Sequence, residues 1–334
     1  MTAALAKFLD WSLIQVMTMR APCNDERTMG LEESLQFLKG PDFLPTECQL
    51  ARVEFNPHAS GLHFRFPTPR PCEFAANNVV HGRLYRCAEH WQERPVIVLL
   101  HGGMDFPNHR FLFPLIARRC NRAGFNAATM ELPYHFQRHV RQLDGGIHLR
   151  LAELIAQGVA EIRALTGWFL GKGCPAVALW GVSLGAWLAG LVSCRDARLA
   201  SVVMTASPAR LNNLLSQAEQ IVWRRSREMH VGLRAAYDAL DTTPLNLNLS
   251  QPIIPRENIL LIEGMYDLCV SSGPIELWQT WGRPEIWRLP HGHIGIGSQL
   301  ITGLRGRVLR WLAPRLNAPA ATKRVSRGFP RNAE

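Results

Sequence analysis

The sequence has no closely spaced cysteine pair, no long apolar run and few acidic residues. Its eight cysteines are scattered and never form a C-x-x-C pair, which argues against a disulfide framework or a zinc site and favours a reducing, cytoplasmic compartment. The first 20 residues are apolar but contain Lys7 and Asp10, and they lack the basic start and A-x-A site of a signal peptide. They are also too short and too interrupted for a membrane span. Two interpretations remain: a helix docked on the domain, or one lying on a membrane surface.

Acidic residues are outnumbered by basic ones, 27 against 37, which gives a net charge of +10. No nucleic-acid-binding motif accompanies the excess, so we expect no nucleic-acid partner. A solvated basic surface is the simplest interpretation, and weak attraction to an anionic membrane surface or an anionic substrate is the alternative. Part of the charge lies in residues 317–334, a small, polar, proline-bearing stretch that we expect to be disordered. The sequence contains no internal repeat and does not indicate an oligomeric state.

A glycine-flanked serine stands between a strand pattern and a helix pattern. Residues 176–180 are apolar and compatible with a strand, and they run into Gly181-Val182-Ser183-Leu184-Gly185. The next nine residues are good helix formers. This is the G-x-S-x-G pattern, in which a sharp turn projects the serine hydroxyl from the end of a sheet while the glycines let strand and helix pass closely. Ser183 is therefore the predicted nucleophile.

A second motif follows a buried strand expected at residues 96–100. The chain continues there as His101-Gly102-Gly103-Met104. A developing oxyanion needs backbone N–H groups that no side chain obstructs, and glycines after such a strand provide them. An ordinary strand-ending turn is the alternative. His101 itself would either orient its own loop or take part in the chemistry. We predict an oxyanion hole formed by the amide of Gly103 or Met104 together with that of Leu184.

The acid that would accompany the serine is expected after another buried strand, residues 258–264. Asp267 lies in the loop that follows, whereas Glu263 lies at the end of the strand itself. A carboxylate has to reach from the loop toward a histidine, and Asp267 suits this position better. Ser272 and Pro274 then have the character of a helix start.

The predicted base follows the last strand, expected at residues 285–290, in the run His291-Gly292-His293. His291 comes directly after Pro290 and still belongs to the strand exit, whereas Gly292 allows a bend that places His293 at the loop tip. We therefore predict His293 as the base and Ser298 as the cap of the final helix. The H-x-H spacing also occurs in metal sites, but no further ligands at workable spacing accompany it, so we expect neither a metal nor a cofactor.

With serine, acid and histidine in this order, the chain resembles the α/β-hydrolase superfamily from about residue 50 to residue 316. A closer resemblance, to the branch called alpha/beta-hydrolase-domain protein eighteen, comes from E-x-P-Y at residues 131–134, from G-V-S-L-G and from G-H-I at residues 292–294. The H-G-G loop departs from that branch, so its substrates are no guide here. The resemblance also favours His293 as the base, since it lies in the G-H-I tripeptide.

The order of patterns predicts the architecture. Three antiparallel strands are expected between residues 50 and 87, with turn signals at Asn56-Pro57 and at 67–71. Alternating strands and helices follow from residue 95, with the longest helix at 147–170. This predicts an α/β fold, the α/β-hydrolase fold: a doubly wound, mostly parallel sheet with an antiparallel N-terminal edge. The predicted divisions are an N-terminal helix (about 3–20) and linker over 1–49, the core over 50–206 and 258–316, a helical cap insertion over 207–257, and the tail.

The insertion at 207–257 is much longer than a crossover helix requires. Apolar residues at helical spacing, among them Leu211, Leu214 and Val222, indicate two or more helices. A cap over the site is the functional interpretation, and an extended crossover packed at the side is the alternative. The arginines at 224, 225 and 227 would meet an anionic group on a substrate or simply form a solvated face. Three residues that follow a predicted strand would line the pocket or support a turn through local hydrogen bonds: Tyr134, His135 and Arg138.

Together these patterns predict a serine hydrolase that cleaves a small-molecule carboxylic ester or thioester through an acyl-enzyme. Ser183 would attack the carbonyl, His293 would transfer the proton and Asp267 would orient the imidazole. An acyltransferase with the same three residues is an alternative, since the sequence does not distinguish water from another acceptor. A non-catalytic binding protein with a hydrolase fold is a second alternative.

Overall fold

The computed structural model describes residues 2–19, 31–45, 47–58, 61–103, 108–141, 150–214 and 227–317. Several positions singled out in the sequence lie outside these ranges. They include Met104, part of the insertion with Val222, Arg224 and Arg225, and the C-terminal tail. Among the described residues, no helix is long and apolar enough to cross a membrane.

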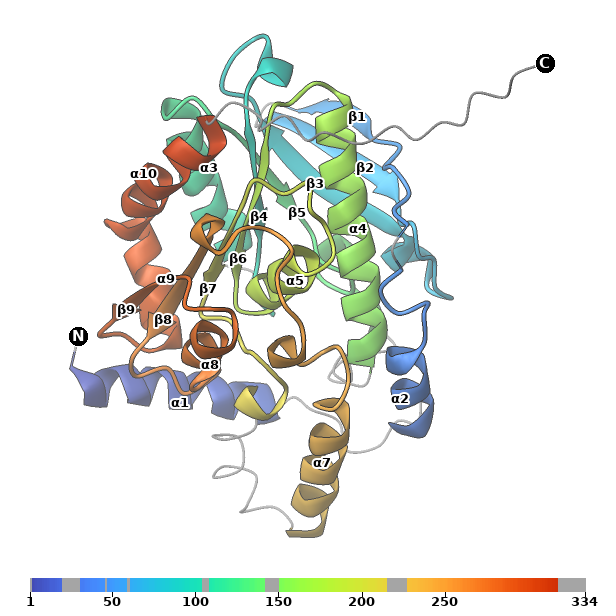
Figure 1. The fold of residues 1–334 in the computed structure, drawn as a ribbon, viewed down its shortest axis with the longest axis vertical. Coiled ribbons are helices and arrows are strands. Elements are labelled where there is room, and N and C mark those ends of the chain that lie inside the picture. The colour runs from blue at the N-terminus through green and yellow to red at the C-terminus, as the bar shows by residue number, and fades with distance from the viewer. Residues whose placement is uncertain are drawn as a thin grey trace, which may run out of the picture.

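Within the described residues one nine-stranded sheet runs through the molecule (Figure 1). Its strand order is β1-β2-β3-β5-β4-β6-β7-β8-β9. The pairs from β1 to β5 are antiparallel and all later pairs are parallel, so the predicted mostly parallel sheet with an antiparallel N-terminal edge is confirmed. The strand bounds are β1 Glu54–His58, β2 Gly61–Pro67, β3 Val79–Tyr85, β4 Val96–Leu100, β5 Asn126–Met130, β6 Val177–Val182, β7 Ser201–Thr205, β8 Ile259–Gly264 and β9 Glu285–Leu289.

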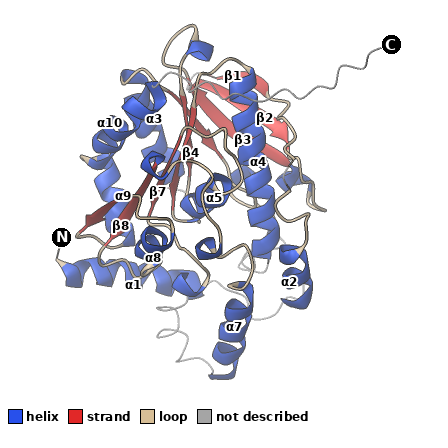
Figure 2. Cartoon of the chain, in the orientation of Figure 1, coloured by secondary structure: helices blue, strands red, loops and turns tan. Residues whose placement is uncertain are grey.

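Helices cover both faces of the sheet, as Figure 2 shows. Every residue of β4, β6, β7 and β8 is buried, because alternate side chains enter the core on opposite faces. On β4, Val98 belongs to the core under α4 and α5, whereas Ile97 belongs to the core under α3 and α10. The helix bounds are α1 Ala3–Met19, α2 Leu31–Lys39, α3 Phe113–Arg122, α4 Leu151–Gly171, α5 Leu184–Ser193, α7 Arg227–Leu240, α8 Gly273–Thr280, α9 His293–Ile301 and α10 Leu304–Asn317.

The N-terminal part differs from the sequence prediction in two places. Helix α2 lies in the stretch expected to be a linker, with Glu32 and Glu33 in its first turn and Lys39 in its last, charges that suit the helix dipole. Asn56-Pro57 lies inside β1 rather than in a turn. Because β1 is the edge strand, a proline there breaks no inner ladder of hydrogen bonds.

The C-terminal part differs in where its last helices begin. The predicted single helix capped by Ser298 is two helices, α9 and α10, and α9 already begins at His293. Ser298 lies inside α9 and donates a hydrogen bond to the carbonyl of Gly295, so its predicted role as a cap is wrong. No pattern in the sequence indicates a helix in the glycine-rich stretch after His293, because glycine has a low helix propensity.

The long insertion contains helix α7 and a short 3₁₀ turn, Leu247–Leu249. Helix α7 projects away from the sheet beside α2 (Figure 1). The part of the insertion around Leu211 is anchored to the residue that follows α7, since Asp241 accepts hydrogen bonds from the amides of Leu211 and Asn212. A cap over the site stays a prediction.

Candidate active site

Ser183 stands at the junction of β6 and α5 in a strained backbone conformation. Its φ is 53° and its ψ is −114°, a region that non-glycine residues seldom adopt. Its N–H donates to the carbonyl of Thr205 on β7. The turn holds because a β-carbon at Gly181 would lie 2.2 Å from the carbonyl oxygen of Gly185, and one at Gly185 would lie 2.3 Å from that of Leu100. Both glycines are therefore required by close backbone approach.

A chain of hydrogen bonds joins the three residues predicted to carry the chemistry. The Ser183 Oγ lies 3.1 Å from His293 Nε2, and His293 Nδ1 lies 2.7 Å from Asp267 Oδ2. A carboxylate only accepts hydrogen bonds, so Nδ1 carries the proton and Nε2 is the acceptor for the serine hydroxyl. The three residues come from the ends of three different strands, β6, β8 and β9.

Asp267 is held by its own loop. Its second oxygen, Oδ1, accepts the backbone N–H groups of Cys269 and Val270 at 2.8 and 3.0 Å. The side chain is 1% exposed, so these bonds fix the carboxylate in one orientation. Glu263, the competing acid, instead pairs with the guanidinium of Arg288 on β9. It takes no part in the chain of hydrogen bonds to the serine.

His291, the competing histidine, lies two residues before the one that meets the serine. Its backbone N–H donates to the carbonyl of Leu289 and its own carbonyl accepts from the N–H of Tyr266, so its main chain joins the loop after β9 to the loop after β8. Partial burial lowers the pKa of its imidazole below the ordinary value. His293 is the residue whose ring reaches Ser183, as the first residue of α9.

The predicted oxyanion residues lie beside the serine. A β-carbon on Gly103 would come 3.9 Å from the side chain of Leu184, which places the H-G-G loop next to the first residue of α5. Gly103 is exposed, whereas His101 and Gly102 are buried. Met104, the alternative donor, lies outside the described residues.

His101 fixes the H-G-G loop with both ring nitrogens. Nδ1 lies 2.7 Å from the carbonyl of Gly102, and Nε2 accepts the N–H of Leu132 at 3.0 Å. These partners require the neutral tautomer with its proton on Nδ1. Burial and the neighbouring His135 and His109 hold the pKa of His101 well below its usual range, which keeps the ring neutral. His101 therefore orients its loop, the simpler of the two interpretations of that residue.

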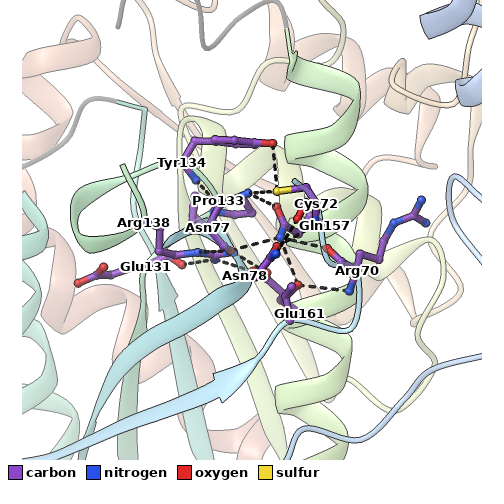
Figure 3. Close-up of polar contacts among 12 residues, drawn as sticks. Arg70, Cys72, Asn77, Asn78, Glu131, Pro133, Tyr134, Arg138, Gln157 and Glu161 are labelled. Atoms are coloured by element: carbon purple, nitrogen blue, oxygen red, sulfur yellow. Dashed lines mark hydrogen bonds and ion pairs between the residues drawn. The ribbon is translucent and has the colours of Figure 1, made fainter. Parts of the chain in front are cut away.

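A buried polar network joins the loop after β5 to Asn77 and to helix α4, as Figure 3 shows. Arg138 is fully buried and forms a two-pronged ion pair with Glu161 of α4 at 2.6 and 2.7 Å. It also donates to the carbonyls of Asn77 and Glu131. The N–H of Tyr134 donates to Asn77 Oδ1. Arg138 and Tyr134 therefore support a turn, and His135, also buried, bonds the carbonyl of Pro133.

Among the described residues, two clusters bring three metal-ligating side chains together, and one of them overlaps the serine site. It consists of Asp267, Cys269 and His293. Burial, Asp267 and Asp10 raise the pKa of the Cys269 thiol far above its ordinary value, so the thiolate that a metal needs is disfavoured. Asp267 and His293 already bond each other. The second cluster is Cys72, Glu73 and Glu153, of which Cys72 is labelled in the network of Figure 3.

One residue at this site was not found by sequence reasoning. Asp10 of α1 is completely buried against the backbone of His293. Its only signal in the sequence is a charge inside an apolar helix, which by itself argues against a membrane span and does not indicate a role at the site.

Comparison with known proteins supports the fold. No family model matches the chain. Two curated relatives, uncharacterized proteins from Mycobacterium tuberculosis strains CDC 1551 and H37Rv, are 27% identical over 248 residues. The match covers 68% of this chain and 58% of each relative, so this chain spans little more than half the length of those proteins.

Several solved structures are similar. Acetyl xylan esterase 1 from Thermoanaerobacterium has a TM-score of 0.56 at 12% identity and covers 90% of this chain and 98% of its own. An acetyl xylan esterase from Paenibacillus has 0.54 at 14%, covering 88% and 98%. The esterase Pf2001 of Pyrococcus furiosus has 0.52 at 13%, covering 78% and 92%. The chain has the α/β-hydrolase fold. These comparisons give no support to the closer resemblance to the protein-eighteen branch.

Proposed function

We propose that this protein is a serine hydrolase that cleaves a carboxylic ester or thioester through an acyl-enzyme. The observation that carries the proposal is the unbroken path of hydrogen bonds from the Ser183 hydroxyl through His293 to Asp267. A serine held in a strained turn, with its hydroxyl against an imidazole, is the arrangement that nucleophilic acyl transfer requires.

In the first half of the reaction Ser183 Oγ attacks the substrate carbonyl. His293 Nε2 takes the hydroxyl proton as the oxygen–carbon bond forms. Asp267 keeps the ring in the tautomer that can accept at Nε2 and stabilises the imidazolium that results. The proton then passes from Nε2 to the leaving alcohol or thiol, and the acyl group stays on Ser183.

The negative charge that develops on the carbonyl oxygen needs donors that are already in place. The amide of Leu184, first residue of α5, lies at the positive end of that helix. The amide of Gly103 is the proposed second donor, because its loop adjoins Leu184. The His101 ring holds that loop by bonding the Gly102 carbonyl with one nitrogen and the Leu132 N–H with the other. Such preorganised donors contribute about 3 kcal/mol each to stabilisation of the transition state.

In the second half water attacks the acyl-enzyme, with His293 as base and then acid. The same chemistry passes the acyl group to an alcohol when one replaces water, so acyl transfer is an outcome of the test. The names of the solved neighbours favour esters as substrates, since the three structures are esterases, two of them acting on acetyl xylan.

A panel of p-nitrophenyl esters and coenzyme-A thioesters of graded acyl length tests the proposal. We expect turnover of at least one series, with a rapid burst of released alcohol or thiol equal to the enzyme concentration when deacylation is slower. Adding glycerol or short alcohols distinguishes transfer from hydrolysis by the ester product. A protein that binds these esters but shows neither burst nor turnover would instead be a binding protein.

A further inference from the structure

The N-terminal helix reaches the proposed catalytic histidine. Helix α1 packs against α9 and lies below α8 in the view of Figure 1. Its docked face includes Ala6 and, one turn later, Asp10, both completely buried, while Leu5, Phe8 and Trp11 stay exposed. Ala6 and Asp10 lie on the same face because residues four apart are neighbours along a helix.

The Asp10 carboxylate is held by three backbone N–H groups. Oδ2 accepts from His293 at 2.7 Å and from Leu268 at 3.1 Å, and Oδ1 accepts from Ile294 at 3.1 Å. Burial and the charge of Asp267 raise the pKa of Asp10, while the three N–H groups act in the opposite direction. Burying a carboxylate costs free energy unless its hydrogen bonds are made. This contact therefore holds α1 and the backbone of Leu268, His293 and Ile294 in one arrangement.

The carboxylate occupies the position that a capping side chain of α9 would take. The N-cap residue of α9 is Gly292, in an extended conformation, and it has no side chain to satisfy the first amides of the helix. A β-carbon at Gly292 would lie 2.6 Å from Asp10 Oδ2. Asp10 therefore supplies, from 283 positions away, the carboxylate that a local aspartate cap would supply.

The same oxygen joins the two loops that carry the acid and the base. Oδ2 binds Leu268, the residue after Asp267, as well as His293 itself. The carboxylate of α1 thus adds a second connection between the loops of Asp267 and His293, beside the hydrogen bond from the Tyr266 N–H to the His291 carbonyl. Without it, the first backbone N–H groups of α9, those of His293 and Ile294, would lose the acceptor that holds this end of the helix.

We propose that Asp10 is a positioning residue of the active site, which caps α9 and sets the position of His293 relative to Asp267 and Ser183. The inference rests on the proposed function, because it concerns the same histidine. It assigns to the N-terminal helix a part in catalysis, where the sequence indicated only a docked or membrane-lying helix.

The variant Asp10→Asn tests the carboxylate while keeping its shape. An amide offers one acceptor oxygen, and its NH₂ group would face a backbone N–H. We expect kcat, and the rate at which a fluorophosphonate labels the serine, to fall at least about tenfold with KM unchanged, because the imidazole is displaced. Lys7→Ala, an exposed change on the same helix, is the matched control and should leave both unchanged. Equal labelling rates in Asp10→Asn and the wild type would overturn the proposal.

A rescue separates positioning from simple loss of stability. Asp10→Ala empties the space beside Gly292, and Gly292→Asp then provides a local cap in a backbone conformation that aspartate accepts. We expect each single variant to lose at least about tenfold in kcat and the double variant to recover most of it. Assays run well below each melting temperature. If Asp10 only anchors α1, the double variant stays as slow as the worse single one, and the proposal fails.

Ser183→Ala in the same assays keeps the two proposals apart. An inactive Ser183→Ala enzyme with fully active Asp10 variants would remove the role of Asp10 and leave the proposed function intact. An active Ser183→Ala enzyme would remove the proposed function itself.

Discussion

The two halves of the candidate site are built in different ways. The serine half is local: Ser183, its two glycines and the strand and helix on either side lie within a few residues of one another, and the obstacles that fix the turn are backbone atoms. The histidine half is assembled from distant parts, because α9 begins at a glycine and is capped from α1. The residues that make the serine turn therefore lie in one short stretch, packed against the neighbouring strands β4 and β7, whereas the histidine depends on the docking of the N-terminal helix.

Ser183→Ala removes the reacting atom of the local half and has the largest expected effect. We predict a loss of about 10⁵-fold or more in kcat. The unfolding midpoint should change little, because the removed hydroxyl lies at a partly exposed turn. Initial rates and urea unfolding check this, and a variant within tenfold of the wild type would show that another residue attacks.

His293→Ala against His291→Ala tests the assembled half. We expect His293→Ala to lose nearly all activity even at alkaline pH, since a hydroxyl without its base stays protonated. His291→Ala should keep at least about a tenth of the rate, because the main chain of this residue, which closes the loop, is unchanged. The measurement is kcat of the two variants at matched thermal stability. If His291→Ala were the slower variant, His291 would be the base.

Asp267→Asn should cost about 10⁴-fold in kcat, because the amide can hold the imidazole in the wrong tautomer. Glu263→Gln is its control: this carboxyl pairs with Arg288 and we expect most of the activity to remain. Steady-state kinetics on both variants provide the measurement. An unimpaired Asp267→Asn enzyme beside an inactive Glu263→Gln enzyme would reverse the assignment.

Gly185→Ala and Gly292→Ala compare the two halves directly. The new β-carbon at 185 meets the backbone carbonyls of Leu100 and His101, which cannot move without the sheet, so we expect a loss of about 3 kcal/mol in unfolding free energy. The three atoms nearest to a β-carbon at 292 all belong to the Asp10 side chain, which can withdraw with α1. Urea unfolding should show a loss of about 1 kcal/mol for Gly292→Ala. The kcat of Gly292→Ala should fall as far as that of Asp10→Asn. Similar stability losses in the two glycine variants would contradict the difference between the serine half and the histidine half.

Acid should destabilise the side of the site that holds the H-G-G loop. Burial, Arg83 and His135 lower the pKa of His109 to about 4, so between pH 6.5 and 4 the unfolded chain binds a proton that the folded chain does not. Stability is then lost as the pH falls through this window, by at most about 3 kcal/mol. His109→Phe, which keeps the stacking on Phe136, should make the unfolding free energy depend less on pH within this window. Asp10 has a raised pKa, so its protonation favours the folded chain as the pH falls. Asp10→Asn should therefore increase the loss of unfolding free energy in acid.

The same contrast explains what the sequence could predict. The strands, the long helix α4 and the turn at Ser183 follow from patterns within short stretches, and the fold followed from their order. The start of α9 could not be predicted from such patterns, because its cap lies 283 positions away and its first turn is rich in glycine. Helix α2 was missed because it is short, and the support given by Arg138 to the loop after β5 depends on Glu161, a partner in another helix.

Labelling with a fluorophosphonate, followed by peptide mass spectrometry, tests the central claim most directly. The probe reacts with a serine whose hydroxyl is activated by a neighbouring base. The account predicts one adduct per chain on the peptide that contains Ser183, absent in Ser183→Ala and greatly slowed in His293→Ala. No adduct on the folded wild-type protein, or an adduct on another residue that persists in Ser183→Ala, would contradict it.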